Sequence, residues 1–138
     1  MHIQLETPTP NTIRSYTAEH VTIGTIEYTH SIIVSGEHII SEWPVYSLQE
    51  LTKTNLGPAL SLKPEIIIIG HQQPTIALPM AVMQCLSNQR IGIECMSIGA
   101  ACRTFNVLLA EKRNVIIGLI FMERGTTSRP SCAVAEQI

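Results

Sequence analysis

Three short, mainly apolar runs in the second half of the chain constrain the fold more than any other feature. They are EIIIIG (65–70), IGIECM (91–96) and VIIGLIF (115–121). Each is far shorter than the ~20 apolar residues that a membrane-spanning helix needs. Their Ile and Val residues favour strands, and a strand that is apolar on both faces is typical of a sheet covered on both sides.

Segments with helical periodicity separate the three runs. The apolar positions that recur at helical spacing are Leu78, Val82, Cys85 and Leu86 in the first segment, and Ala101, Phe105, Leu108 and Leu109 in the second. Pro79 suits a first helical turn, where its missing N–H costs nothing. The order strand, helix, strand, helix, strand predicts right-handed crossovers and largely parallel pairing, with 66–69 and 115–120 as central strands.

The first half has a different texture. Residues 13–46 hold Thr, Val, Ile and Tyr in short runs, which predict an antiparallel meander with its tightest turn at 35–36. Residues 47–52 predict one or two helical turns, with Ser47 as N-cap and Glu50 completing a capping box. Residues 54–64 are expected to be a loop, because they contain Gly57, Pro58 and Pro64.

Length and composition limit the class of protein. The 138 residues fit one domain, 1–138, in which we expect 1–12 and 124–138 to be loosely structured. Only 14% of residues are charged, against about 25% in typical domains, which indicates a large buried fraction or a surface covered by a partner. The formal net charge of -2 and the lack of a basic run argue against a nucleic-acid partner.

The start of the chain and its four cysteines bear on the compartment. The first residues show neither a secretory signal nor an Arg-rich transit peptide, so a cytoplasmic location is expected. Cys85, Cys95, Cys102 and Cys132 have no CxxC spacing, which argues against a zinc or redox motif and for reduced thiols. We therefore expect no metal, no cofactor and no disulfide.

Polar candidates follow the first two strands of the second half. Ligands of open α/β sheets bind beyond the carboxyl ends of the strands, where this chain has Gly70 and His71 after one strand and Ser97 after the next. Ser97 is expected to cap the following helix, whose free N–H groups attract anions. With Arg103 and Asn106 on that helix, these residues make a candidate small-anion pocket.

Each candidate also has a structural interpretation. An arginine such as Arg103 more often pairs with a carboxylate such as Glu94 or donates to backbone carbonyls, and Asn106 more often satisfies loop backbone groups. His71 is either a base near neutral pH or a lone histidine without a spaced partner. Cys102 is either an activated thiolate or a small buried apolar residue. No GxGxxG, GxxxxGK or serine-hydrolase triad pattern is present, so we expect no catalytic residue.

The strings IIIIG (66–70), IGIECMS (91–97) and AACRTFN (100–106), with SGEHIISEWPV (35–45), resemble the Mth938-like family of uncharacterised proteins. The family's eukaryotic relative is a mitochondrial factor that assists assembly of respiratory complex I. The resemblance implies a three-layer α/β fold, with a mixed central sheet and an N-terminal antiparallel β layer packed on it. It adds Thr104 to the candidate pocket residues. The chain departs from many members in having Phe105 instead of Tyr, and Gln72 instead of a second glycine.

Two functions remain open at this point. The first is a non-enzymatic interaction or assembly protein, with an unidentified protein partner and peripheral membrane association through that partner. The second is a domain or enzyme that binds a small anion or metabolite in the pocket described above. The absent catalytic motif, the low charge and the family resemblance favour the first. The sequence does not predict the oligomeric state.

Overall fold

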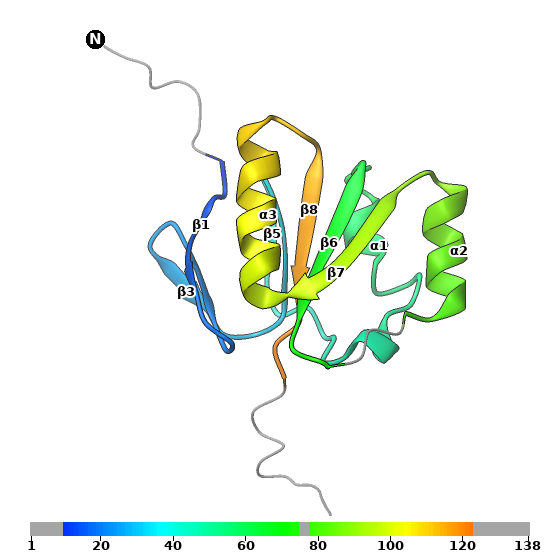
Figure 1. Ribbon diagram of the computed structural model, residues 1–138, viewed down its shortest axis with the longest axis horizontal. Coiled ribbons are helices and arrows are strands. Elements are labelled where there is room, and N and C mark those ends of the chain that lie inside the picture. The colour runs from blue at the N-terminus through cyan, green and yellow to red at the C-terminus, as the bar shows by residue number, and fades with distance from the viewer. Residues whose placement is uncertain (1–9, 75–77, 123–138) are drawn as a thin grey trace, which may run out of the picture.

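The computed structural model describes residues 10–74 and 78–122 of the chain. A three-stranded antiparallel sheet comes first, followed by a five-stranded sheet with helices on both of its faces (Figure 1). The elements are β1 (Ile13–Tyr16), β2 (Val21–Ile23), β3 (Ile26–Tyr28), β4 (Ile32–Ser35), β5 (Ile39–Ile40), the 3-10 turn η1 (Leu48–Glu50), α1 (Gly57–Leu60), β6 (Ile66–His71), α2 (Met80–Asn88), β7 (Gly92–Ser97), α3 (Ile98–Ala110) and β8 (Val115–Leu119).

The five-stranded sheet is mixed, and its order is β5-β4-β8-β6-β7. Strand β6 runs parallel to both β7 and β8, whereas β4 runs antiparallel to β8 and β5. The α/β class, the mixed sheet and the N-terminal β layer are therefore as expected. The expectation of one continuous meander is wrong, because β4 and β5 leave the small sheet and pair in the large one. All four residues of β4 are buried, which suits a strand covered on both faces.

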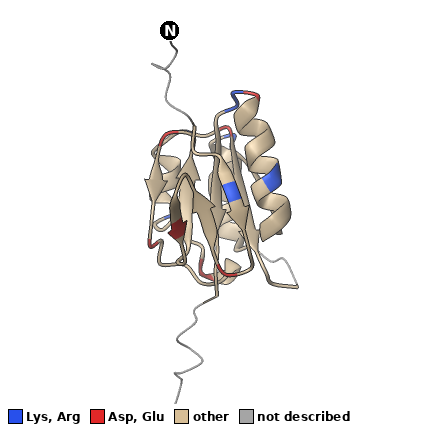
Figure 2. Cartoon of the chain, turned by 90° about the vertical axis from the view of Figure 1, so that its left-hand side faces the viewer, with Lys and Arg blue, Asp and Glu red and all other residues tan. Residues whose placement is uncertain are grey.

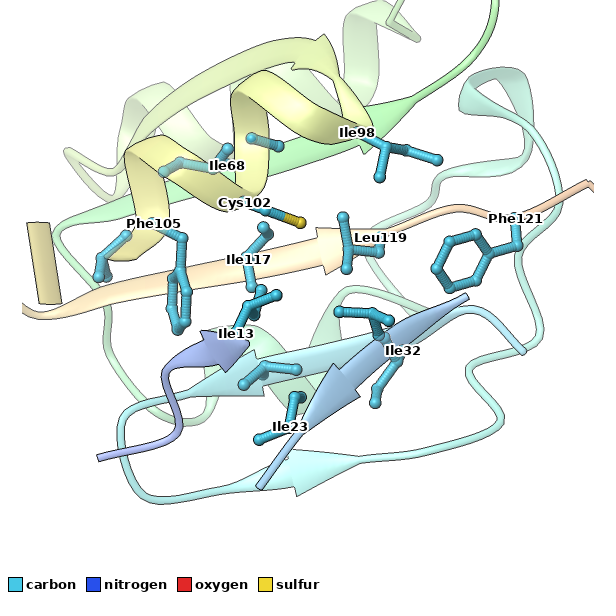
Figure 3. Close-up of a cluster of buried hydrophobic side chains, with 14 residues drawn as sticks. Ile13, Ile23, Ile32, Ile68, Ile98, Cys102, Phe105, Ile117, Leu119 and Phe121 are labelled. Carbon is cyan, nitrogen blue, oxygen red and sulfur yellow. The ribbon is translucent and has the colours of Figure 1, made fainter. Parts of the chain in front are cut away.

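Two apolar cores lie on opposite faces of the five-stranded sheet. One core lies between that sheet and a layer made of α3 and the small sheet (Figure 3). The other lies beneath α1, α2 and η1. Ile68 points into the first core, while Ile67 and Ile69 point into the second. The unbroken Ile run is thus explained by burial on both sides, and the prediction that 66–69 and 115–120 are central strands is confirmed.

Three local predictions are wrong. Ser47 makes no side-chain cap bond, and the Glu50 carboxylate instead accepts the N–H of Tyr46 at 3.0 Å, so no capping box forms. Residues 57–60 form the helical turn α1 rather than loop, because Pro58 lies in its first turn, where no N–H is needed. Helix α2 begins at Met80 and leaves Pro79 at the N-cap, one position before the predicted place.

Candidate functional site

Helix α3 begins directly after β7, with no intervening loop. Ser97 is its N-cap, and the Ser97 hydroxyl oxygen accepts the N–H of Ala100 at 3.3 Å. This confirms the cap that the sequence predicts. The start of α3 lies against the end of β6, because Ser97 and His71 are register partners in the parallel pair.

Gly70 lets α3 approach the sheet closely. A Cβ at this position would lie 2.7 Å from Leu119 Cδ2 and 2.9 Å from Ala101 Cβ. Both distances are shorter than real Cβ contacts, so a larger residue would force the helix or β8 to shift. Gly70 is thus a packing requirement between β6, β8 and α3, whatever else it does.

Asn106 joins α3 to the first strand of the small sheet. Its Nδ2 donates to the Ile13 carbonyl oxygen at 2.9 Å, and its Oδ1 accepts the Ile13 N–H, also at 2.9 Å. The side-chain amide therefore makes, with one residue of β1, the two hydrogen bonds that a neighbouring strand would make. The structural interpretation of Asn106 holds, with a strand in place of the expected loop.

Arg103 lies on the same side of α3, one turn earlier, and is exposed. Its Nη1 donates to the Tyr16 hydroxyl at 2.8 Å. The pairing with Glu94 or with backbone carbonyls is wrong, because the nearest acceptor comes from β1. The Tyr16 ring packs over Gly99, where an added Cβ would lie 3.1 Å from Tyr16 Cε1.

Thr104 faces the other flank of α3. Its hydroxyl donates to Met96 Sδ on β7 at 3.6 Å. Arg103 and Asn106 reach toward β1 while Thr104 reaches toward β7, so α3 does not direct these three side chains at one point.

His71, at the end of β6, is buried and only 4% exposed. Its Nδ1 accepts the N–H of Gln73 at 3.0 Å, so the neutral ring carries its proton on Nε2. Nε2 is buried and has no hydrogen-bond partner among the described residues. Burial lowers the pKa of His71, since it disfavours the charged imidazolium.

The loop after β6 is tied down by glutamine side chains. Gln73 Oε1 accepts the N–H of Leu48 at 2.6 Å, and Gln73 Nε2 donates to Gln49 Oε1 at 3.0 Å. Gln72 Nε2 donates to the Ala18 carbonyl in the β1–β2 turn. Gln72 thus fastens the loop after β6 to the β1–β2 turn. Sequence reasoning did not assign these roles, because their partners are distant in the chain.

The described cysteines are free and poorly suited to act as nucleophiles. Cys85, Cys95 and Cys102 form no disulfide, while Cys132 lies outside the described residues. Burial raises the pKa of Cys102 to about 12, and burial together with the Glu94 carboxylate raises the pKa of Cys95 to about 11. Cys102 fits the interpretation of a small buried apolar residue (Figure 3).

A groove of about 880 Å³ lies at the opposite end of the sheet, beside the start of β8. Its lining includes Gly36, Leu109, Lys112 and Val115, and none of the predicted pocket residues. No pattern in the sequence predicts this groove, because its walls come from four separate segments.

Residues 10–74 and 78–122 contain no group of three His, Cys, Asp or Glu side chains placed to hold a metal ion. No helix formed by these residues is long and apolar enough to cross a bilayer.

Residues 13–120 match the family model described as protein of unknown function (DUF498/DUF598), and the chain belongs to this family. A crystal structure of a Bordetella parapertussis protein superposes with a TM-score of 0.74 at 28% identity, covering 82% of this chain and 97% of that one. A Bordetella pertussis protein described as an Mth938-like domain has a TM-score of 0.72 at 22% identity, covering 93% and 99%. The resemblance to Mth938-like proteins is confirmed.

Curated relatives carry two kinds of name. The "13 kDa major membrane protein" of Francisella tularensis is 29% identical over 90 residues, 64% of this chain and 73% of the relative. NADH dehydrogenase (ubiquinone) 1 alpha subcomplex assembly factor 3 is 33% identical in Drosophila melanogaster and 32% in Homo sapiens, over 59% and 65% of this chain. The matched part spans 43% and 50% of those two assembly factors.

Proposed function

We propose that this chain is a non-enzymatic interaction protein that assists assembly of a respiratory complex of the complex I type. The names of the two assembly-factor relatives support a role in the assembly of such a complex. The observation that supports a non-enzymatic role is the set of contacts that the AACRTFN segment makes within the fold. Its Asn106 and Arg103 side chains bond to β1, which holds the two sheets together.

The chemistry of the candidate residues supports the same conclusion. A nucleophilic thiol needs a depressed pKa, and the pKa values of Cys95 and Cys102 are raised instead. A general base needs access to its substrate, whereas His71 is buried. These side chains are therefore better suited to packing in the interior of the fold than to catalysing a reaction.

The surface suits a protein partner more than a polyanion. Figure 2 shows the side that carries the small sheet, where Lys, Arg, Asp and Glu occupy only isolated positions. We place the chain in the cytoplasm, where its thiols stay reduced, and propose that it reaches the membrane through its partner. The name of the Francisella relative supports a membrane association.

An affinity capture tests this proposal. The tagged chain would be captured from native lysate of its source cell with and without mild detergent, beside an unrelated bait of similar size, and the eluates identified by mass spectrometry. Subunits of an NADH dehydrogenase should be enriched with detergent. Blue native gels of cells lacking the protein should show less assembled complex, restored by the parent chain. Unchanged complex levels would refute the assembly role.

One observation favours the second candidate, a domain that binds a small anion or metabolite. The buried Nε2–H of His71 has no acceptor among the described residues, and a buried donor without a partner costs about 1–3 kcal/mol. A ligand oxygen would satisfy it. Phosphate and small carboxylates should then raise the melting temperature of the parent and not of His71→Asn. Equal responses of the two proteins would leave this candidate without support.

A further inference from the structure

Strand β7 is an open border of the five-stranded sheet. The other border, β5, has two residues, which is one way in which proteins blunt a sheet edge. Strand β7 has six residues and, within residues 10–74 and 78–122, pairs on one side only, with β6. It contains no proline, lysine or arginine, the residues that usually protect such an edge.

The free hydrogen-bonding groups of β7 can be assigned from its register. In a parallel pair, alternate residues turn both their N–H and C=O toward the neighbouring strand. The N–H of Gly92 donates to the Glu65 carbonyl at 3.0 Å, so Gly92 faces β6. Ile93 and Cys95 therefore turn their N–H and C=O groups outward, and no backbone partner for them exists among the described residues.

Both faces of this border are partly apolar. Ile93 and Cys95 extend the core beneath α2, and Met96 extends the core beneath α3. On the α3 side, Val107 lies one turn beyond Thr104, the residue that contacts Met96, and it is 57% exposed. Apolar surface thus continues from both cores to the open strand.

We propose that β7 pairs antiparallel with β7 of a second copy of this chain, about a two-fold axis at Cys95. This register opposes Cys95 to its own copy and Ile93 to Ser97, and it uses the outward N–H and C=O groups of Ile93 and Cys95. It also opposes Glu94 to Met96, so no like charges meet.

Neighbouring two-fold registers fit less well. An axis at Glu94 opposes two carboxylates directly, which is destabilising. An axis at Ile93 needs Ile91 as a strand residue, but the N–H of Ile91 donates to the Leu86 carbonyl in the turn after α2. Of these three two-fold registers, the axis at Cys95 alone uses the outward groups of β7 without opposing two carboxylates or drawing on Ile91.

The first test is the oligomeric state in solution. Sedimentation equilibrium of the parent, from micromolar to millimolar protein, should show a monomer–dimer equilibrium. Cys95→Pro removes an outward N–H that the monomer does not use, and proline is tolerated at such edge positions. It removes one N–H···O bond from each copy, two per dimer, and should raise the dimer dissociation constant at least about tenfold, since a loss of ~1.4 kcal/mol is worth that factor. Cys95→Ala keeps the N–H and should dimerise like the parent.

A cross-linking test decides the register without a proline. Opposed residues of a hydrogen-bonded antiparallel pair have Cα atoms about 5.5 Å apart, within disulfide range. Oxidation with copper phenanthroline should give a covalent dimer in a Cys85→Ser/Cys132→Ser variant, and none once Cys95→Ala is added. A chain that stays monomeric and uncross-linked, or a dimer that Cys95→Pro leaves unchanged, overturns the proposal. In the first case the border is left for a strand of another protein.

Discussion

The side-chain amide of Asn106 is hydrogen-bonded to both the N–H and the C=O of Ile13, 93 residues away in sequence. One side chain of α3 thereby satisfies two backbone groups of β1 that none of the described strands pairs. Ile13 itself is buried in the core shared by the two sheets. The contact fixes where the small sheet lies on the larger part of the molecule.

We expect Asn106→Ala to lower the free energy of unfolding by about 1–3 kcal/mol, because it leaves two part-buried backbone groups without hydrogen-bond partners. Urea denaturation followed by circular dichroism measures this cost. Val107→Ala, at the adjacent exposed position, is the control and should stay within about 0.5 kcal/mol. A loss for Asn106→Ala no larger than that of the control would show that the amide does not fasten the sheet.

Arg103 and Tyr16 form a more exposed contact between the same two elements. Arg103→Ala and Tyr16→Phe should each cost about 0.5–1.5 kcal/mol, the net value of one hydrogen bond. The double variant should cost less than the sum, since both single changes remove the same interaction. Strictly additive costs in the thermodynamic cycle would mean that the pair contributes nothing in solution.

Gly70→Ala should destabilise the fold by about 1–3 kcal/mol through overpacking, because the new methyl group meets Leu119 and Ala101. Gly57→Ala is the matched control. A Cβ there has no neighbour within 4 Å, so the change should be neutral or stabilise by about 0.4–1 kcal/mol. In thermal unfolding, Gly70→Ala should lower the melting temperature, whereas Gly57→Ala should raise it or leave it unchanged. Equal melting temperatures would contradict the close approach of α3 to β6.

His71 should make stability fall in mild acid. Its pKa is lowered in the folded state by burial, so below its ordinary value of 6.5 the unfolded chain takes up the proton first. Stability is therefore full above that pH and declines as the pH falls toward the lowered pKa of the folded protein, by up to about 1.4 kcal/mol per pH unit.

The measurement for His71 is the free energy of unfolding at several pH values between neutrality and mild acid. His71→Asn should flatten the curve, whereas His30→Asn, at an exposed position, should leave it parallel to that of the parent. If His71→Asn keeps the slope of the parent, other groups are responsible for the acid sensitivity.

The sequence predicted the second half of the fold well, because its signals are local. The Ile run of β6 and the apolar spacing of α3 each report burial of the segment that contains them. The division of the first half between two sheets was missed, although β4 reads Ile-Ile-Val without alternation while β2 and β3 are interrupted by polar residues. An unbroken run was the available sign of a strand covered on both faces.

The candidate site was predicted less well than the fold. Arg103 and Asn106 were correctly placed on one side of α3, since i, i+3 geometry depends on the helix alone. Their partners Tyr16 and Ile13 were not foreseen, because pairings across 87 and 93 residues leave no periodic trace in a single sequence. The residues of β6 were also not assigned to one or the other face of the sheet. Gly70 and His71 are adjacent in this strand, so their side positions lie on opposite faces.

The position of β8 has a consequence for biosynthesis. Of the described strands this one is made last, yet it lies between β4 and β6 in the middle of the sheet. While the ribosome is still translating residues 115–119, the two halves of the sheet have no shared strand and expose the apolar edges of β4 and β6. The nascent chain therefore cannot mature stepwise from its N-terminus. The chain must be synthesised to the end of β8 before the five-stranded sheet can form. During that interval it is the kind of client that ribosome-associated chaperones shield from aggregation.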